Sequence, residues 1–132
     1  MNHLFAFLLA FTTLNCLGTQ STTSTNGDPD PSVLVGTWQL DMTPENPDDS
    51  NFAMMEIRQI TDKGFEGVFY RDGVRIREGR LNTQRGIIYG ALVSGDNSGE
   101  YNSSFYYEDG VLYGSTHAIG RGFLAVWTAT KQ

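Results

Sequence analysis

The feature that most constrains this chain is an alternation of residue character that continues from Ser32 to the C-terminus. One side of the segment 33–42 is formed by Leu34, Gly36, Trp38 and Leu40. Such a period of two residues is typical of a half-buried β-strand, and no stretch after Ser32 keeps the period of 3.6 that a helix needs. The sequence therefore predicts an all-β domain over residues 32–132.

Turn signals divide this domain into about eight strands, expected at 33–42, 52–60, 65–70, 74–77, 86–94, 100–108, 111–117 and 123–130. Asp72-Gly73 and Asp109-Gly110 are strong hairpin signals. Short connections favour antiparallel neighbours in up-and-down order, and closing such a sheet removes its exposed edges. We therefore expect an eight-stranded antiparallel barrel, wide enough for side chains or one small ligand. A sandwich is the alternative, with 43–50 and 94–99 as its crossing connections.

The residues before this domain predict export of the protein and its attachment to a membrane. Residues 1–15 carry no formal charge and hold an apolar run, Leu4 to Phe11, that is too short to span a bilayer but suits a signal peptide. The following Thr13-Leu14-Asn15-Cys16 resembles a bacterial lipobox, in which the cysteine is lipidated. Residues 17–31 are almost all small and polar, so we expect a flexible linker.

These features predict a protein held to the bacterial cell envelope, in particular the outer membrane, by acyl chains on Cys16. Two alternatives remain open. Ordinary signal cleavage after Gly18 would release a secreted protein, because Cys16 and Gly18 supply small residues at the two key positions. In the third reading Cys16 is an inert thiol.

The charge balance limits the classes of partner that we expect this protein to bind. Nine Lys and Arg residues stand against fifteen Asp and Glu, which gives a net charge of −6 without a basic cluster. Nucleic-acid binding depends on neutralising phosphates, and docking on anionic lipid depends on basic segments, so neither is expected. Contact with a membrane is expected through the lipid anchor only, and a single cysteine excludes a disulfide scaffold.

The first predicted strand also carries a family resemblance. Leu34-Val35-Gly36-Thr37-Trp38 resembles the opening of the lipocalin-like, or calycin, barrels, whose Gly-x-Trp plugs the closed end. The segment Gly120 to Ala129 is similar to the end of small bacterial lipocalin-like lipoproteins, and the resemblance covers about residues 33–131. It implies structural roles for Gly36 and Trp38. It also implies that Lys131 occupies the place of the basic residue that packs on this tryptophan in many lipocalins.

Candidate binding residues come from three consecutive predicted strands: Tyr89, Tyr101, Phe105, Tyr107 and Tyr113. They could form an aromatic cup for a small amphipathic ligand, or a packed core whose hydroxyls reach the rim. Trp38 and Trp127 are expected to fill the core. His117 and Arg121 are candidates for holding an anionic group, if both face one mouth of the barrel; otherwise they are surface residues.

Catalysis has little support in the sequence. Ser115 and His117 share a strand face, yet such residues lie about 7 Å apart, too far for direct proton transfer. Zinc is not expected, because His117 is the only histidine after the signal and Cys16 is acylated. We therefore expect no enzyme, no metal and no cofactor. The sequence predicts a barrel that binds a small hydrophobic or amphipathic molecule, or alternatively a protein-interaction or inhibitor module that acts through loops 43–50 and 94–99.

Overall fold

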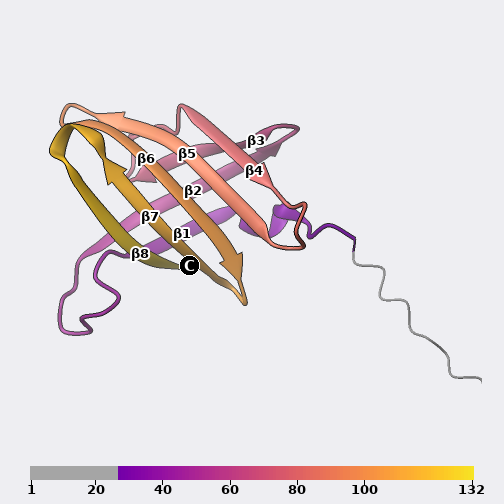
Figure 1. The fold of residues 1–132 in the computed structure, drawn as a ribbon, viewed down its shortest axis with the longest axis horizontal. Helices are drawn as coiled ribbons and strands as arrows, with labels where there is room; N and C mark the ends of the chain where they lie inside the picture. The colour runs from indigo at the N-terminus through magenta and orange to yellow at the C-terminus, as the bar shows by residue number, and fades with distance from the viewer. Residues whose placement is uncertain (1–26) are drawn as a thin grey trace, which may run out of the picture.

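A computed structural model describes residues 27–132, in which eight antiparallel strands form one sheet rolled into a nearly closed barrel (Figure 1). The strands are β1 (Gly36–Asp41), β2 (Phe52–Thr61), β3 (Gly64–Tyr70), β4 (Glu78–Asn82), β5 (Ile88–Asp96), β6 (Gly99–Glu108), β7 (Val111–Ala118) and β8 (Phe123–Lys131). Two short 3-10 helices are η1 (Pro31–Leu34) and η2 (Ile119–Arg121). The predicted all-β, up-and-down barrel is confirmed.

The sheet order is β3-β2-β1-β8-β7-β6-β5-β4, so β1 and β8 pair and bring the two ends of the domain together. Neither helix in residues 27–132 is long and apolar enough to cross a bilayer. The predicted signal at 1–15, Cys16 and the linker up to residue 26 lie outside the described residues. Among the described residues, the first regular element is η1, which begins at Pro31 and is capped by Asp30, whose carboxylate accepts from Ser32 N at 2.9 Å.

Side chains that alternate along the strands fill the barrel. The largest fully buried ones include Trp38, Trp127, Phe69, Leu40, Met55 and Ile57. A short polar chain runs through this core: Trp127 Nε1 donates to Thr116 Oγ1 at 3.0 Å, and that hydroxyl lies 2.7 Å from Ser103 Oγ. Because the buried indole N–H has a partner, the tryptophan can occupy the centre without a desolvation penalty on that group.

The end of the barrel where β1 begins is closed by η1. Trp38 is 1% exposed and donates from Nε1 to Leu34 O at 2.8 Å, which fixes the helix across the opening. Lys131 Nζ lies 5.5 Å from the Trp38 ring centroid and donates to Val33 O at 2.8 Å. Gly36 has φ +137°, and a Cβ there would lie 2.9 Å from Lys131 Cε. Glycine at position 36 therefore allows both the positive φ angle of the backbone and the close approach of the Lys131 side chain.

We expect Lys131→Ala to lower the free energy of unfolding by about 1 kcal/mol, since it removes an exposed cation–π contact and a hydrogen bond to Val33. Lys131→Arg keeps a cation and donors at this place and is expected to retain most of the stability. Urea unfolding of both variants measures the effect. Wild-type stability in Lys131→Ala would show that the lysine does not stabilise the plugged end.

β3 and β4 meet at a seam where the barrel is only partly hydrogen-bonded. Phe69 N donates to Val74 O and Ile76 N to Gly67 O, each at 2.9 Å. Arg77 N then donates to Val93 O at 2.8 Å, so the chain passes from β3 to β5. The predicted strand at 74–77 is therefore wrong in position: these residues form a single bridge to β3, and β4 starts at Glu78.

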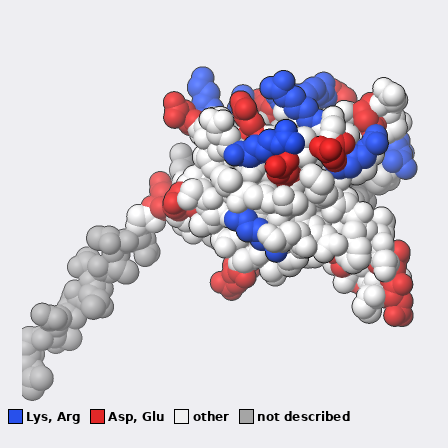
Figure 2. Space-filling view, turned by 180° about the vertical axis from the view of Figure 1, so that it is seen from behind, with Lys and Arg blue, Asp and Glu red and all other residues white. Residues whose placement is uncertain are grey.

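Charged side chains of both signs are interleaved over part of the surface (Figure 2). Four ion pairs join them: Arg58 with Glu56, Arg71 with Asp96, Arg77 with Glu100, and Arg80 with Glu78. Three of these arginines come from the β3–β4 connection and β4. Pairing each with a carboxylate gives this region little net charge.

Candidate functional site

The end of the barrel opposite η1 contains a pocket of about 350 Å³. The end of β1, the start of β2, the end of β3 and the start of β8 surround it, together with η2. Its walls are mostly apolar and include Phe52, Phe69, Phe123 and Ala125. The Phe69 ring packs on Trp127 at a centroid distance of 5.9 Å. Because Trp127 is fully buried, the pocket ends at this layer of the core.

The polar residues that line this open-end pocket are Asn51, Tyr70, Tyr101, Thr116 and Arg121. The two tyrosine rings pack edge to face with centroids 5.2 Å apart. The Arg121 guanidinium lies over the Phe123 ring at 4.8 Å, and no carboxylate of residues 27–132 forms an ion pair with it. The arrangement offers a recess with aromatic and aliphatic walls and one cation that no carboxylate of the described residues neutralises.

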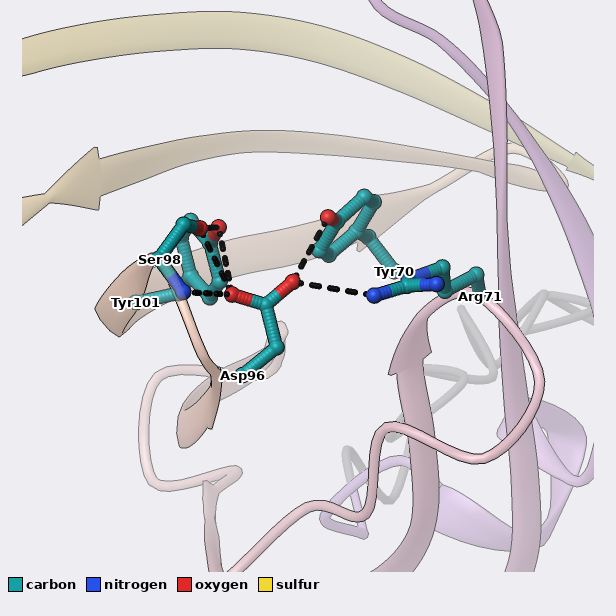
Figure 3. Close-up of polar contacts among 5 residues, drawn as sticks. All are labelled: Tyr70, Arg71, Asp96, Ser98 and Tyr101. Atoms are coloured by element: carbon teal, nitrogen blue, oxygen red, sulfur yellow. Dashed lines mark hydrogen bonds and ion pairs between the residues drawn. The ribbon is translucent and has the colours of Figure 1, made fainter. Parts of the chain in front are cut away.

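Asp96, at the end of β5, holds the rim of this pocket together (Figure 3). Its Oδ1 accepts from Ser98 N at 2.8 Å, from Ser98 Oγ at 2.6 Å and from Tyr101 OH at 3.2 Å. Its Oδ2 accepts from Tyr70 OH at 2.9 Å and from Arg71 at 3.2 Å. The carboxylate thus joins the end of β3 to the β5–β6 turn and fixes both tyrosines of the pocket.

These hydrogen bonds, that from the Ser98 hydroxyl first, hold the pKa of Asp96 well below its ordinary value. Burial, followed by the hydrogen bond to Asp96, raises the pKa of Tyr70. This cluster is not predicted by the sequence. The only local signal was Asp96-Asn97-Ser98, a spacing that allows the aspartate to accept from the backbone two residues on.

The depressed pKa of Asp96 has a consequence for stability. A carboxyl group whose folded-state pKa lies below its unfolded value of 3.8 stabilises the fold above pH 3.8 and loses that contribution as the pH falls towards the folded-state pKa. We expect Asp96→Asn to be less stable than wild type at pH 7 and the difference to shrink below pH 3.8. Urea unfolding across this range measures it. A difference independent of pH would contradict a role for the ionised carboxylate.

The five predicted aromatic residues do not line one cavity. Tyr101 and Phe105 are buried, and Tyr107 is half-buried beside Trp38. Tyr89 and Tyr113 point outward, each 37% exposed. The strand register explains why these two side chains point outward. Tyr89 and Tyr113 both lie directly opposite Tyr106, whose side chain is on the outer face of β6.

His117 and Arg121 are not brought together. His117 is exposed on the outer face of β7, while its neighbours Thr116 and Ala118 point into the barrel. Arg121 follows in η2 and reaches the open-end pocket. Of the predicted binding residues, only Tyr101 and Arg121 line this pocket. Within residues 27–132, no three His, Cys, Asp or Glu side chains gather as a metal site.

The geometry gives a nearly closed eight-stranded antiparallel barrel, compatible with a calycin-like fold, with one plugged and one pocketed end. In comparisons with known proteins, no family model, no curated protein and no solved structure matches this chain.

Proposed function

We propose that this protein is a lipocalin-like lipoprotein of the bacterial cell envelope that binds a small anionic amphiphile at the open end of its barrel. The observation that carries the proposal is the open-end pocket, where apolar side chains meet Arg121, whose guanidinium forms no ion pair with a carboxylate of the described residues. Binding sites are typically apolar recesses with a few convergent polar groups. The proposal assigns no enzymatic role to the protein.

The size of the pocket limits the ligand. Its volume of about 350 Å³ is near the lower end of ordinary ligand sites, roughly 300–1,000 Å³. The packed layer of Phe69 and Trp127 leaves no room for a long chain to enter the core. A short apolar body would pack on Phe52 and Phe69, and an anionic head would reach Arg121, whose charge no carboxylate of the described residues neutralises.

Attachment to the envelope is supported by the sequence of the N-terminal region. The apolar run from Leu4 to Phe11 and the cysteine at position 16 fit a lipoprotein signal. Metabolic labelling with a radioactive fatty acid, in the wild type and in Cys16→Ser, tests this part. Loss of the label in the variant is expected, whereas an unlabelled wild-type protein would rule out lipidation.

Binding is tested by titrating the protein with decanoate in a calorimeter. We expect Arg121→Gln to weaken binding about tenfold, because it removes a charge-assisted hydrogen bond to the carboxylate. Ala125→Trp fills the recess and should abolish binding. Arg85→Gln, in the β4–β5 connection outside the pocket, is the matched control. No binding to wild type, or equal binding to all three variants, would exclude this pocket as the site.

A protein-interaction or inhibitor module is the second candidate. The β1–β2 connection projects beyond the barrel at its open end and exposes Glu45, Asp48 and Asp49 (Figures 1 and 2). An exposed acidic loop is suited to a basic protein surface. Shortening this loop should then abolish capture of a partner while leaving the decanoate titration unchanged; the opposite result favours the small ligand.

A further inference from the structure

Three outward tyrosines form a row across the barrel wall. Tyr89 on β5, Tyr106 on β6 and Tyr113 on β7 lie directly opposite one another in the strand register. Their ring centroids are 6.4 Å and 5.1 Å apart, and the rings of Tyr106 and Tyr113 stack within 17° of parallel. Each residue is 36–37% exposed. This tyrosine ladder is a rigid aromatic ridge on the surface.

Beside the tyrosine ladder runs a row of short side chains, Ala91, Ser104 and Ser115, which also lie directly opposite one another. The tyrosine ladder and this row of short side chains together form an open groove of about 870 Å³. It extends from Arg80 on β4 to Val126 on β8. Five strands at a spacing of about 4.8 Å make it roughly 19 Å long. It shares no lining residue with the open-end pocket.

The floor of the groove is rigid. The inner sides of Gly90 and Gly114 are covered by the rings of Phe105 and Trp127, because a Cβ at either glycine would overlap a ring. The buried core therefore supports the strands directly beneath the short side chains. A preformed groove of ordered side chains loses little conformational entropy when a ligand binds.

The polar groups of the groove are hydroxyls that the described protein leaves available. Side-chain hydrogen bonds within residues 27–132 do not use the hydroxyls of Tyr89, Tyr106, Tyr113, Ser104, Ser115 or Thr128. Each hydroxyl can both donate and accept. The one charged residue of the lining, Arg80, is paired with Glu78 at 2.8 Å. The groove thus offers hydroxyl and aromatic surface without net charge.

We propose that this groove binds a neutral oligosaccharide. A sugar chain presents hydroxyl edges, which match the available hydroxyls, and apolar C–H faces, which pack on aromatic and aliphatic side chains such as Tyr113 and Val126. An anionic ligand such as a nucleotide would find no unpaired cation in the lining. The length of the groove suits a chain of several sugar units.

Other occupants fit less well. An extended peptide usually adds to a sheet edge, whereas β5, β6, β7 and β8 are each paired on both sides. A second copy of the chain related by a two-fold axis would place this concave patch against itself. Two hollows facing each other leave a void, which a closely packed interface does not contain. A narrow, hydroxyl-rich chain fills the groove instead.

The test is a titration of the ¹⁵N-labelled protein with maltohexaose, cellohexaose and chitohexaose, followed by NMR. We expect at least one of these sugars to bind and to shift amide signals of β5, β6 and β7. Tyr106→Ala should weaken binding about tenfold, since it removes the central ring of the ladder. Ser115→Trp should abolish binding, because the indole fills the floor; this outward position allows the variant to fold.

Gln39→Trp is the matched control, because it adds the same indole at an exposed, outward position on β1, outside the groove. Its affinity should equal that of the wild type. The proposal is overturned if none of the three sugars shifts signals of β5, β6 and β7, or if Ser115→Trp and Gln39→Trp bind equally. A concentration-dependent dimer lost in Ser115→Trp would instead assign the groove to a second copy.

Discussion

Replacing Trp38 with alanine is expected to lower the free energy of unfolding by about 3–5 kcal/mol, as for other large buried aromatic residues. The total stability of a domain this size is about 5–15 kcal/mol, so a large part would be lost. The substitution leaves a cavity at the plugged end, deprives Leu34 O of its donor and removes the ring beneath Lys131. Guanidinium unfolding followed by circular dichroism measures the change.

If Trp38→Ala cannot be isolated folded, Trp38→Phe gives the same information on a smaller scale. It keeps an aromatic ring but lacks the N–H that donates to Leu34, so a loss of about 1–3 kcal/mol is expected. Val126→Ala is the control, because Val126 is 60% exposed and should change stability little. Trp38→Ala with the stability of Val126→Ala would mean that the indole does not hold η1.

Gly64→Ala is expected to have the second largest effect, about 3 kcal/mol, at the upper end of the usual range for overpacking. At the seam the backbones of Gly64 and Gly79 touch, and a Cβ on Gly64 would overlap the carbonyl oxygen of Gly79. A carbonyl cannot move aside as a flexible side chain can, so β3 and β4 must separate. Chemical unfolding measures the loss, and hydrogen exchange at Phe69 N and Ile76 N reports whether the seam opens.

Gly73→Ala separates this collision from ordinary backbone strain. Gly73 has φ +80° and nothing within 4 Å of a built Cβ, so alanine there should lose only about 1–2 kcal/mol from the left-handed conformation. We expect hydrogen exchange at Phe69 N and Ile76 N to be faster in Gly64→Ala but not in Gly73→Ala. Equal loss in the two variants, with unchanged exchange at Ile76 N, would show that the seam accommodates the methyl group without separating.

Much of the fold followed from the alternation of side chains, but β4 did not. The placement of Trp38 and Leu40 inside β1 was predictable because their neighbours are polar or small. β4, Glu78–Asn82, has charged and small residues where a strand pattern needs apolar ones. Its second residue, Gly79, is required by the contact with β3, a relation between distant segments that local periodicity does not contain.

The candidate site was only partly predictable, because side-chain size rather than polarity decides which face of β7 is inside. Tyr113 and His117 are the larger residues, yet Gly114 and Thr116 face the core. The Trp127 ring already occupies the space over Gly114, which leaves no volume for a tyrosine there. Tyr101 and Arg121 were predicted for the site, whereas Asp96 was missed because its partners come from β3 and β6.

The first described residues lead into the barrel at its plugged end. Pro29 and Asp30 lie beside Ile87 and Asp109, in the connections next to η1. The open-end pocket lies at the opposite end of the barrel. If the proposed attachment at Cys16 is correct, the tether joins the barrel at the plugged end and the binding pocket lies at the end farther from it.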